Sequence, residues 1–114
     1  MADLGTFVYG DTGTDTEITL VPAPRAPVGQ VIDLTGATAI SLEASSSGRD
    51  RISVAGSLSG PPSNGKLIFE DLGAAFAPTA QRPLVYFEGY VKWTQDGELF
   101  YSLDQVKFAI RLFP

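Results

Sequence analysis

Apolar and polar residues alternate through most of this sequence, and that alternation is the feature that most constrains the fold. It runs through Thr16–Leu20 and Ala39–Ala44 and returns at Ile52 and Val54. Successive side chains of a β-strand point to opposite faces of a sheet, so each stretch is typical of a half-buried strand. No stretch follows the period of about 3.6 residues that marks an amphipathic helix. The chain is therefore expected to fold almost entirely from β-strands.

Turn-forming residues interrupt the alternation at short intervals. The expected turns are Gly10–Gly13, Pro22–Pro24, Ser45–Gly48 and Gly60–Gly65. Short strands separated in this way are typical of a small β-sandwich or β-barrel. Glu70–Phe76 lacks β-branched residues and is instead expected to form a short helical turn. The 114 residues, of which 44% are hydrophobic, suit one domain that spans positions 1–114.

The C-terminal third predicts a long β-hairpin. Odd-numbered apolar residues in Val85–Trp93 form one face of a strand, and Leu99 and Tyr101 after the turn are odd-numbered as well. Residues that share a face oppose each other, so Trp93 is expected opposite Leu99 across the three-residue loop Gln95–Gly97. The glycine at the end of this loop, Gly97, then takes the left-handed conformation that such loops need.

Beyond Leu103 the apolar positions become even-numbered. One extra residue must be absorbed if these side chains are to return to the same face of the sheet. A β-bulge near Asp104–Gln105 is the simplest way to absorb it, and it places Val106 opposite Phe87. The predicted hairpin is therefore long and kinked.

Charge and missing residue types exclude several classes of function. With 13 acidic and 8 basic residues, the net charge of -5 offers phosphate backbones no general attraction, so nucleic acid is not an expected partner. The sequence has no histidine and no cysteine, which removes disulfides, imidazole or thiolate metal sites and the common catalytic triads. We expect no enzymatic activity, cofactor or metal. The sequence also lacks a signal peptide and an apolar run of roughly 20 residues, so we expect a soluble, cytoplasmically made protein without membrane contact.

Carboxylates are the remaining candidates for metal or acid–base chemistry. Asp11, Asp15 and Glu17 fall in or beside one loop, where oxygen ligands could gather around calcium. Their spacing differs from that of a calcium-binding loop, and a plain turn is the favoured interpretation. Either Glu70 with Asp71 or Glu88 with Glu98 could form the carboxylate pair of a glycoside hydrolase, but such a pair needs a fixed separation across a cleft.

Aromatic residues are the candidate partner contacts. In the predicted hairpin, Tyr86, Tyr90 and Phe100 share the face that points away from the core, and tyrosine-rich exposed strands bind proteins or sugars. Packing across the strands, or cover by a neighbouring loop, is the alternative. Residues 1–9 form either an edge strand of the domain or an arm that pairs with a neighbouring subunit. The candidate contacts are Phe7, Tyr9, Tyr86, Tyr90 and Phe100.

The order of several turn motifs resembles a known family. Gly10–Val21 reads GDTGTDTEITLV and Val31–Glu43 reads VIDLTGATAISLE, and a glycine-led strand at Gly65 and an Asp96–Gly97 hairpin follow. From about Phe7 to Leu112, this order resembles the N-terminal immunoglobulin-like domain of phage baseplate upper proteins. The resemblance implies an immunoglobulin-like antiparallel β-sandwich of about seven to eight strands. In it, Thr35–Gly36 would form the corner between two strands, and Ile40 and Leu42 would point into the core. The motif glycines are then structural turn residues without a catalytic role: Gly10, Gly13, Gly36 and Gly97.

The resemblance also implies a function. It indicates a structural component of a tailed-phage virion, in the neck, the tail, a baseplate adaptor or the capsid decoration, that contacts other virion proteins. Repeated copies in a symmetric assembly are expected. The sequence ends directly after the last expected strand, so host recognition is not expected of it. The alternative is a carbohydrate-binding module on the virion surface that uses Tyr86, Tyr90 or Trp93, and exposure of Trp93 would favour it.

Overall fold

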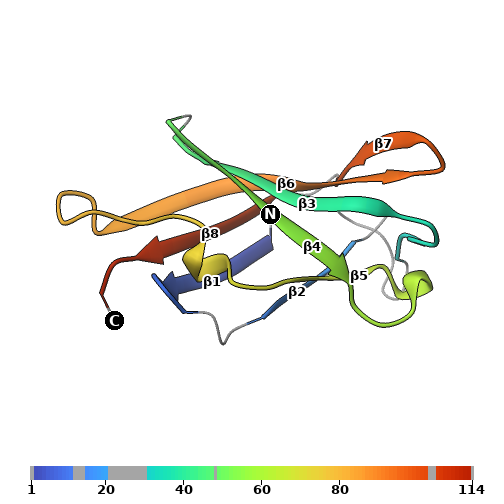
Figure 1. Cartoon of the computed structure of the whole chain (residues 1–114), viewed down its shortest axis with the longest axis horizontal. Coiled ribbons are helices and arrows are strands. Elements are labelled where there is room, and N and C mark those ends of the chain that lie inside the picture. Colours follow the sequence, from blue (N-terminus) through green and yellow to red (C-terminus); the bar gives the residue numbers. More distant parts are fainter. Residues whose placement is uncertain (1, 12–14, 21–30, 48, 103–104, 114) are drawn as a thin grey trace.

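A computed structural model describes residues 2–11, 15–20, 31–47, 49–102 and 105–113, and its fold is all-β, as expected. The short helical turn expected within Glu70–Phe76 is also present, as η2. The elements in chain order are β1 (Ala2–Val8), β2 (Thr16–Thr19), β3 (Thr38–Ser46), β4 (Asp50–Leu58), η1 (Pro62–Asn64), β5 (Lys66–Phe69), η2 (Leu72–Ala74), β6 (Leu84–Gln95), β7 (Glu98–Tyr101) and β8 (Val106–Arg111) (Figure 1).

Eight strands form one sheet in the order β1-β8-β6-β3-β4-β5-β2, with β7 paired to β6. The expectation of a purely antiparallel sheet is wrong at one edge, because β1 pairs with β8 in parallel. Antiparallel neighbours are usually joined by short hairpins, whereas β1 and β8 are the first and last strands of the chain, so no hairpin sets their relative direction. Residues 2–8 are therefore an edge strand of this domain, which was one of the two alternatives for the N-terminal segment.

The sheet folds over on itself along β4. Asp50–Ala55 pair with β3, whereas Gly56–Leu58 pair with β5. Gly56 allows this change of partner because a Cβ there would lie 2.5 Å from the ring of Phe69. As a result, β1 and β2 lie on the opposite side of the core from β6 and β3, in a nearly barrel-shaped arrangement (Figure 1).

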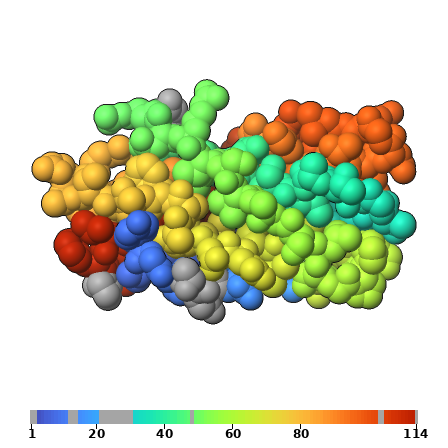
Figure 2. Space-filling view, in the orientation of Figure 1, coloured from blue at the N-terminus to red at the C-terminus, as the bar shows by residue number. Residues whose placement is uncertain are grey.

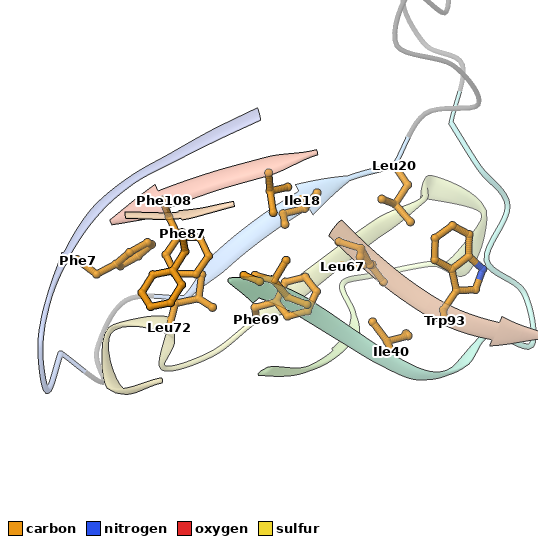
Figure 3. Packing of buried hydrophobic residues seen from close by; sticks show 14 of the residues in the cluster. Phe7, Ile18, Leu20, Ile40, Leu67, Phe69, Leu72, Phe87, Trp93 and Phe108 are labelled. Atoms are coloured by element: carbon orange, nitrogen blue, oxygen red, sulfur yellow. The ribbon is translucent and has the colours of Figure 1, made fainter. Parts of the chain in front are cut away.

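The space between the two sides is filled by apolar side chains from nearly every strand (Figure 3). Ile40 and Leu42 are buried, which confirms that the alternating stretch after the Thr35–Gly36 corner faces the core. Phe87 stacks on Phe108 across β6 and β8, with ring centroids 5.3 Å apart. Burial of these side chains from water supplies the main driving force for the fold.

The hairpin between β6 and β7 turns through two residues instead of the predicted three. Gln95 pairs with Glu98, and Trp93 pairs with Phe100. Asp96 and Gly97 both have positive φ values, 53° and 78°, as a type I′ turn requires. The three-residue loop was predicted on the assumption that Leu99 faces the core, but this side chain is 53% exposed.

The predicted register between β6 and β8 is also wrong. Val106 pairs with Gly89, and Phe108 pairs with Phe87, which is two residues away from the expected pairing of Val106 with Phe87. The inward-facing residues are even-numbered in both β7 and β8, since Phe100 opposes Trp93 and Val106 opposes Gly89. The expected bulge includes Asp104, which lies outside the described residues.

Candidate interaction surface

Alternate residues of β6 point away from the core and give the sheet a solvent-facing side, here called the outer face. Cross-strand pairs place side chains from β1, β3, β4, β7 and β8 on the same face. Its aromatic and large apolar members are Leu84, Tyr86, Tyr90, Leu99 and Tyr101, and its charged members are Asp3, Glu43, Arg51, Glu88, Lys92, Lys107 and Arg111. The outer face therefore mixes tyrosines with paired and unpaired charges.

The tyrosines of the outer face are exposed, although one pair is fixed by mutual contact. Tyr86 is 68% exposed and Tyr101 is 52% exposed. The rings of Tyr90 and Tyr101 meet edge to face, with centroids 5.2 Å apart and planes at 72°. Leu99 stands beside them on the short strand β7, whose four residues are all exposed. Exposed aromatic area of this kind is typical of interaction surfaces.

An ion pair next to this aromatic cluster joins β3 to β6. Lys92 Nζ lies 3.1 Å from Glu43 Oε1. Partial burial raises the pKa of Glu43. Hydrogen bonds from Ser53 and Lys92, together with the charge of Lys92, lower this pKa by more than burial raises it, so the net pKa is below its usual value. Hydrogen bonding to Glu43 and its negative charge raise the pKa of Lys92. Both groups are therefore charged at neutral pH.

The outer face is hollowed between two hairpins. In Figure 2, the β3–β4 tip (green) and the β6–β7 tip (dark orange) both stand up from the body. A groove of about 560 Å³ runs between β3, β4 and β6, and its lining includes Glu43, Arg51, Glu88, Tyr90, Lys92 and Gln105. Gly89 lies in its floor, where a Cβ would overlap the Glu43 carbonyl oxygen and lie 2.6 Å from the Ala44 Cα. Glycine at this position lets β3 and β6 approach closely.

A clasp that the sequence did not reveal holds the Thr35–Gly36 corner against the end of β6. Gln95 Nε2 donates to the carbonyl oxygens of Asp33 and Thr35, at 2.9 and 3.0 Å. The amide oxygen of Gln95 accepts a hydrogen bond from Trp93 Nε1. Within the corner, the Asp33 carboxylate accepts hydrogen bonds from the side chain and backbone of Thr35, which lower the pKa of Asp33. Amide side chains are common in loops, so no sequence signal marked Gln95.

The candidate contacts are divided between the surface and the interior. Tyr86 and Tyr90 lie on the outer face, and Tyr9 is exposed just after β1. Phe7 is buried against Phe108, with ring centroids 6.2 Å apart, and is not available to a partner. Phe100 lies on the inner side of the hairpin, where it stacks on Trp93, because the two-residue turn reverses the face predicted for β7.

Two outer-face residues, Leu99 and Tyr101, were missed for the same reason. The three-residue loop assigned them to the core, whereas the two-residue turn points them to solvent. The dipeptide Asp96-Gly97 was the signal that could have found them, because it is a preferred type I′ sequence. Among the turn glycines, Gly10, Gly36 and Gly97 have positive φ values, and Gly13 lies outside the described residues.

The described carboxylates that were considered for metal binding or glycoside hydrolysis do not form such a site. In the described part of the chain, no group of acidic residues is arranged to hold a metal ion. Glu98 pairs with Gln95, which places it about 23 Å along β6 from Glu88, too far for a glycosidase pair. No helix among the described residues is long and apolar enough to cross a membrane.

No protein-family model matches this sequence, and no curated protein matches it either. Functional inference for this chain must therefore come from its motifs and from the chemistry of its surfaces. Of these surfaces, the outer face combines exposed aromatic area with charged groups and a groove. It is the candidate site with the strongest physical support.

Proposed function

We propose that this chain is a non-enzymatic structural component of a tailed-phage virion and that it contacts other virion proteins through its outer face. The observation that carries the proposal is the exposure of Tyr86, Leu99 and Tyr101 on one side of the sheet. A domain without partners would leave this apolar area in water, whereas a contact would remove it from water.

The outer face is suited to protein contacts because its aromatic residues are presented on strands. A strand holds each side chain in one direction, and the edge-to-face contact of Tyr90 with Tyr101 restricts both rings further. Tyrosine supplies a large contact area and a hydroxyl group while losing little conformational entropy on binding. Such residues are common among those that dominate binding energy in protein interfaces.

The virion setting is supported by the resemblance of Gly10–Val21 and Val31–Glu43 to phage baseplate upper proteins. The corner at Asp33–Gly36 has the structural character that the resemblance implies, since its side chains hydrogen-bond within the turn. Location in the neck, tail, baseplate or capsid decoration is part of the proposal, as is the presence of several copies in each particle. Partners are other virion proteins, and neither nucleic acid nor a membrane is proposed.

Mass spectrometry of purified particles from the phage or prophage that encodes this chain tests the proposal. We expect the chain in the particle, with a copy number near that of the capsid protein for decoration or a small multiple of three or six elsewhere. A version with Tyr86→Ser and Tyr101→Ser should be depleted from particles, while Tyr9→Ser, an exposed tyrosine off the outer face, should be incorporated normally. Absence of the unaltered chain from particles would contradict the proposal.

Carbohydrate binding is a second candidate function, favoured by the groove in which Tyr90 lies beside Glu88 and Gln105. An aromatic ring with neighbouring carboxylate and amide groups can stack on a sugar and hydrogen-bond its hydroxyls. Trp93, whose exposure would have favoured this function, is only 2% exposed. Retention of the chain on immobilised host-surface glycans, lost in Tyr90→Ala and kept in Tyr9→Ala, would support this candidate over protein contacts.

A further inference from the structure

Charge is distributed unevenly between the outer face and the opposite side of the molecule. The outer face carries four basic residues, Arg51, Lys92, Lys107 and Arg111, against three acidic ones, Asp3, Glu43 and Glu88. The chain as a whole has a net charge of -5. The outer face therefore has a small basic excess on an otherwise acidic protein.

Part of the acidic excess lies around β2 and β5, across the core from β6 (Figure 1). Over Asp15–Thr19 and Lys66–Asp71, Lys66 is the one basic residue, and the carboxylates are Asp15, Glu17, Glu70 and Asp71. All four are exposed, and the pairing of Thr16 with Phe69 brings Asp15 and Glu70 to the same end of these strands. We name this surface the acidic face.

The two faces also complement each other in hydrogen bonding. Lysine, arginine and the hydroxyl groups of Tyr86 and Tyr90 are donors on the outer face, while ionised carboxylates on the acidic face can only accept. Neither Arg51 nor Arg111 has an ion pair with another described residue, and the same holds for Asp15 and Glu70. Ile68 lies half-buried on β5, opposite Glu17, and offers apolar area near the middle of the acidic face.

We infer that the outer face of one copy binds the acidic face of a second copy, head to tail. This inference rests on the proposed function and names the neighbour that the outer face contacts. Contact between two outer faces would bring their basic residues together, and contact between two acidic faces would bring carboxylates together. Head-to-tail contact avoids both repulsions. Each copy then uses both faces, and such a contact closes into a ring or continues as a filament, depending on its rotation.

The first measurement is the mass of the purified full-length chain by sedimentation equilibrium as salt is varied. We expect association that grows with protein concentration in about 0.01 M salt and disappears in about 1 M salt, because the screening length falls from about 30 Å to about 3 Å. A chain that stays monomeric in low salt at high concentration would overturn the inference. Association that high salt leaves unchanged would also overturn it, since apolar contact alone would then explain the complex.

Two variants separate head-to-tail contact from face-to-face contact. Arg51→Glu with Arg111→Glu disables the outer face, and Asp15→Asn with Glu70→Gln weakens the acidic face. All four residues are exposed, so folding should be preserved, and circular dichroism checks this for each variant. Each variant alone should remain monomeric in low salt. Mixed together, they should form only a 1:1 complex, because the intact outer face of the second binds the intact acidic face of the first.

The same two variants would also reveal a symmetric contact between two outer faces. If two outer faces met, the acidic-face variant would still associate with itself as strongly as the unaltered chain, and the mixture would form no new complex. That result would refute head-to-tail binding. It would leave the proposed function intact, which depends on finding the chain in particles. Presence in particles together with a purified chain that is monomeric in low salt would likewise refute only the contact between copies.

Discussion

The two ends of β6 each carry a pair of stacked aromatic rings, and the pairs differ in what surrounds them. Toward the start of the strand, Phe87 stacks on Phe108 with ring centroids 5.3 Å apart, and both rings are buried. Toward its end, Trp93 stacks on Phe100 at 5.8 Å, yet Phe100 remains 38% exposed. The same cross-strand contact thus lies inside the core at one end and at the surface at the other.

Neighbouring elements cause this difference. At the Phe87 end, Phe7 from β1 meets Phe108 edge to face, and Phe76 after η2 meets Phe87 edge to face. At the other end, β7 pairs only with β6 among the described strands. Aromatic pairs stabilise a sheet locally, but their burial depends on a second layer. The end of β6 with Phe87 is covered on both sides and is here called the closed end. The end with Trp93, here called the open end, lacks such cover, and its strand β7 contributes Leu99 and Tyr101 to the outer face.

Removing the ring at the closed end should have the largest effect. Phe87→Ala leaves a cavity among Phe7, Phe76 and Phe108 and should lower the free energy of unfolding by about 4 kcal/mol. Urea unfolding followed by tryptophan fluorescence, with Trp93 as the reporter, measures it. A decrease in the free energy of unfolding below about 1 kcal/mol would show that Phe87 is not packed among these rings as described.

A smaller loss of stability is expected from a change at Gly89, which lies on β6 between the closed and the open end. Gly89→Ala places a methyl group against the backbone of Glu43 and Ala44, so β3 and β6 must separate, at a cost of about 2 kcal/mol. Unfolding of this variant is compared with that of Ser57→Ala, an exposed position on β4. Equal stability of the two variants would contradict the close approach of the strands.

The matched substitution at the open end should cost less. Phe100→Ala removes a ring that is already partly in water and that contacts Trp93 from one side, so the expected loss is about 1 kcal/mol. The same urea titration measures it beside Phe87→Ala. If the two substitutions cost the same, the distinction between the closed and the open end fails.

The smallest effect is expected from acid. The pKa of Glu43 is lower in the folded chain than its usual value of 4.5, so its ionised form contributes stability above that pH. The contribution should be lost as pH falls through the lowered pKa. Melting temperatures of Glu43→Gln and the unaltered chain should therefore differ at pH 7 and converge below that pKa. A difference that stays constant with pH would show that the pair with Lys92 does not produce it.

Much of the fold could be predicted from the sequence because it depends on local patterns. Alternation predicted strands over Ala39–Ala44 and Val85–Trp93, which lie within the observed β3 and β6, and identified Ile40, Leu42 and Trp93 as core residues. For the candidate site, the same alternation placed Tyr86 and Tyr90 toward solvent.

Where pairing between distant residues mattered, the predictions were wrong. Leu99 and Tyr101 are apolar yet exposed, so their pattern was assigned to the core and the hairpin register shifted with it. Phe7 was a candidate contact because an apolar residue near a chain end can serve either a core or a partner. The parallel pairing of β1 with β8 places it in the core.

By itself the sequence determined that this chain is all-β, roughly where strands such as β3 and β6 lie, and that histidine or cysteine chemistry is excluded. These properties follow from side-chain periodicity, from turn residues and from composition, which need no knowledge of distant neighbours. Only the tertiary structure decided the register of β6 with β7 and β8, the clasp of Gln95 and the separation of the outer face from the acidic face. Each of these depends on which residues meet across the sheet or lie on opposite sides of the core, and that is set by packing of the whole chain.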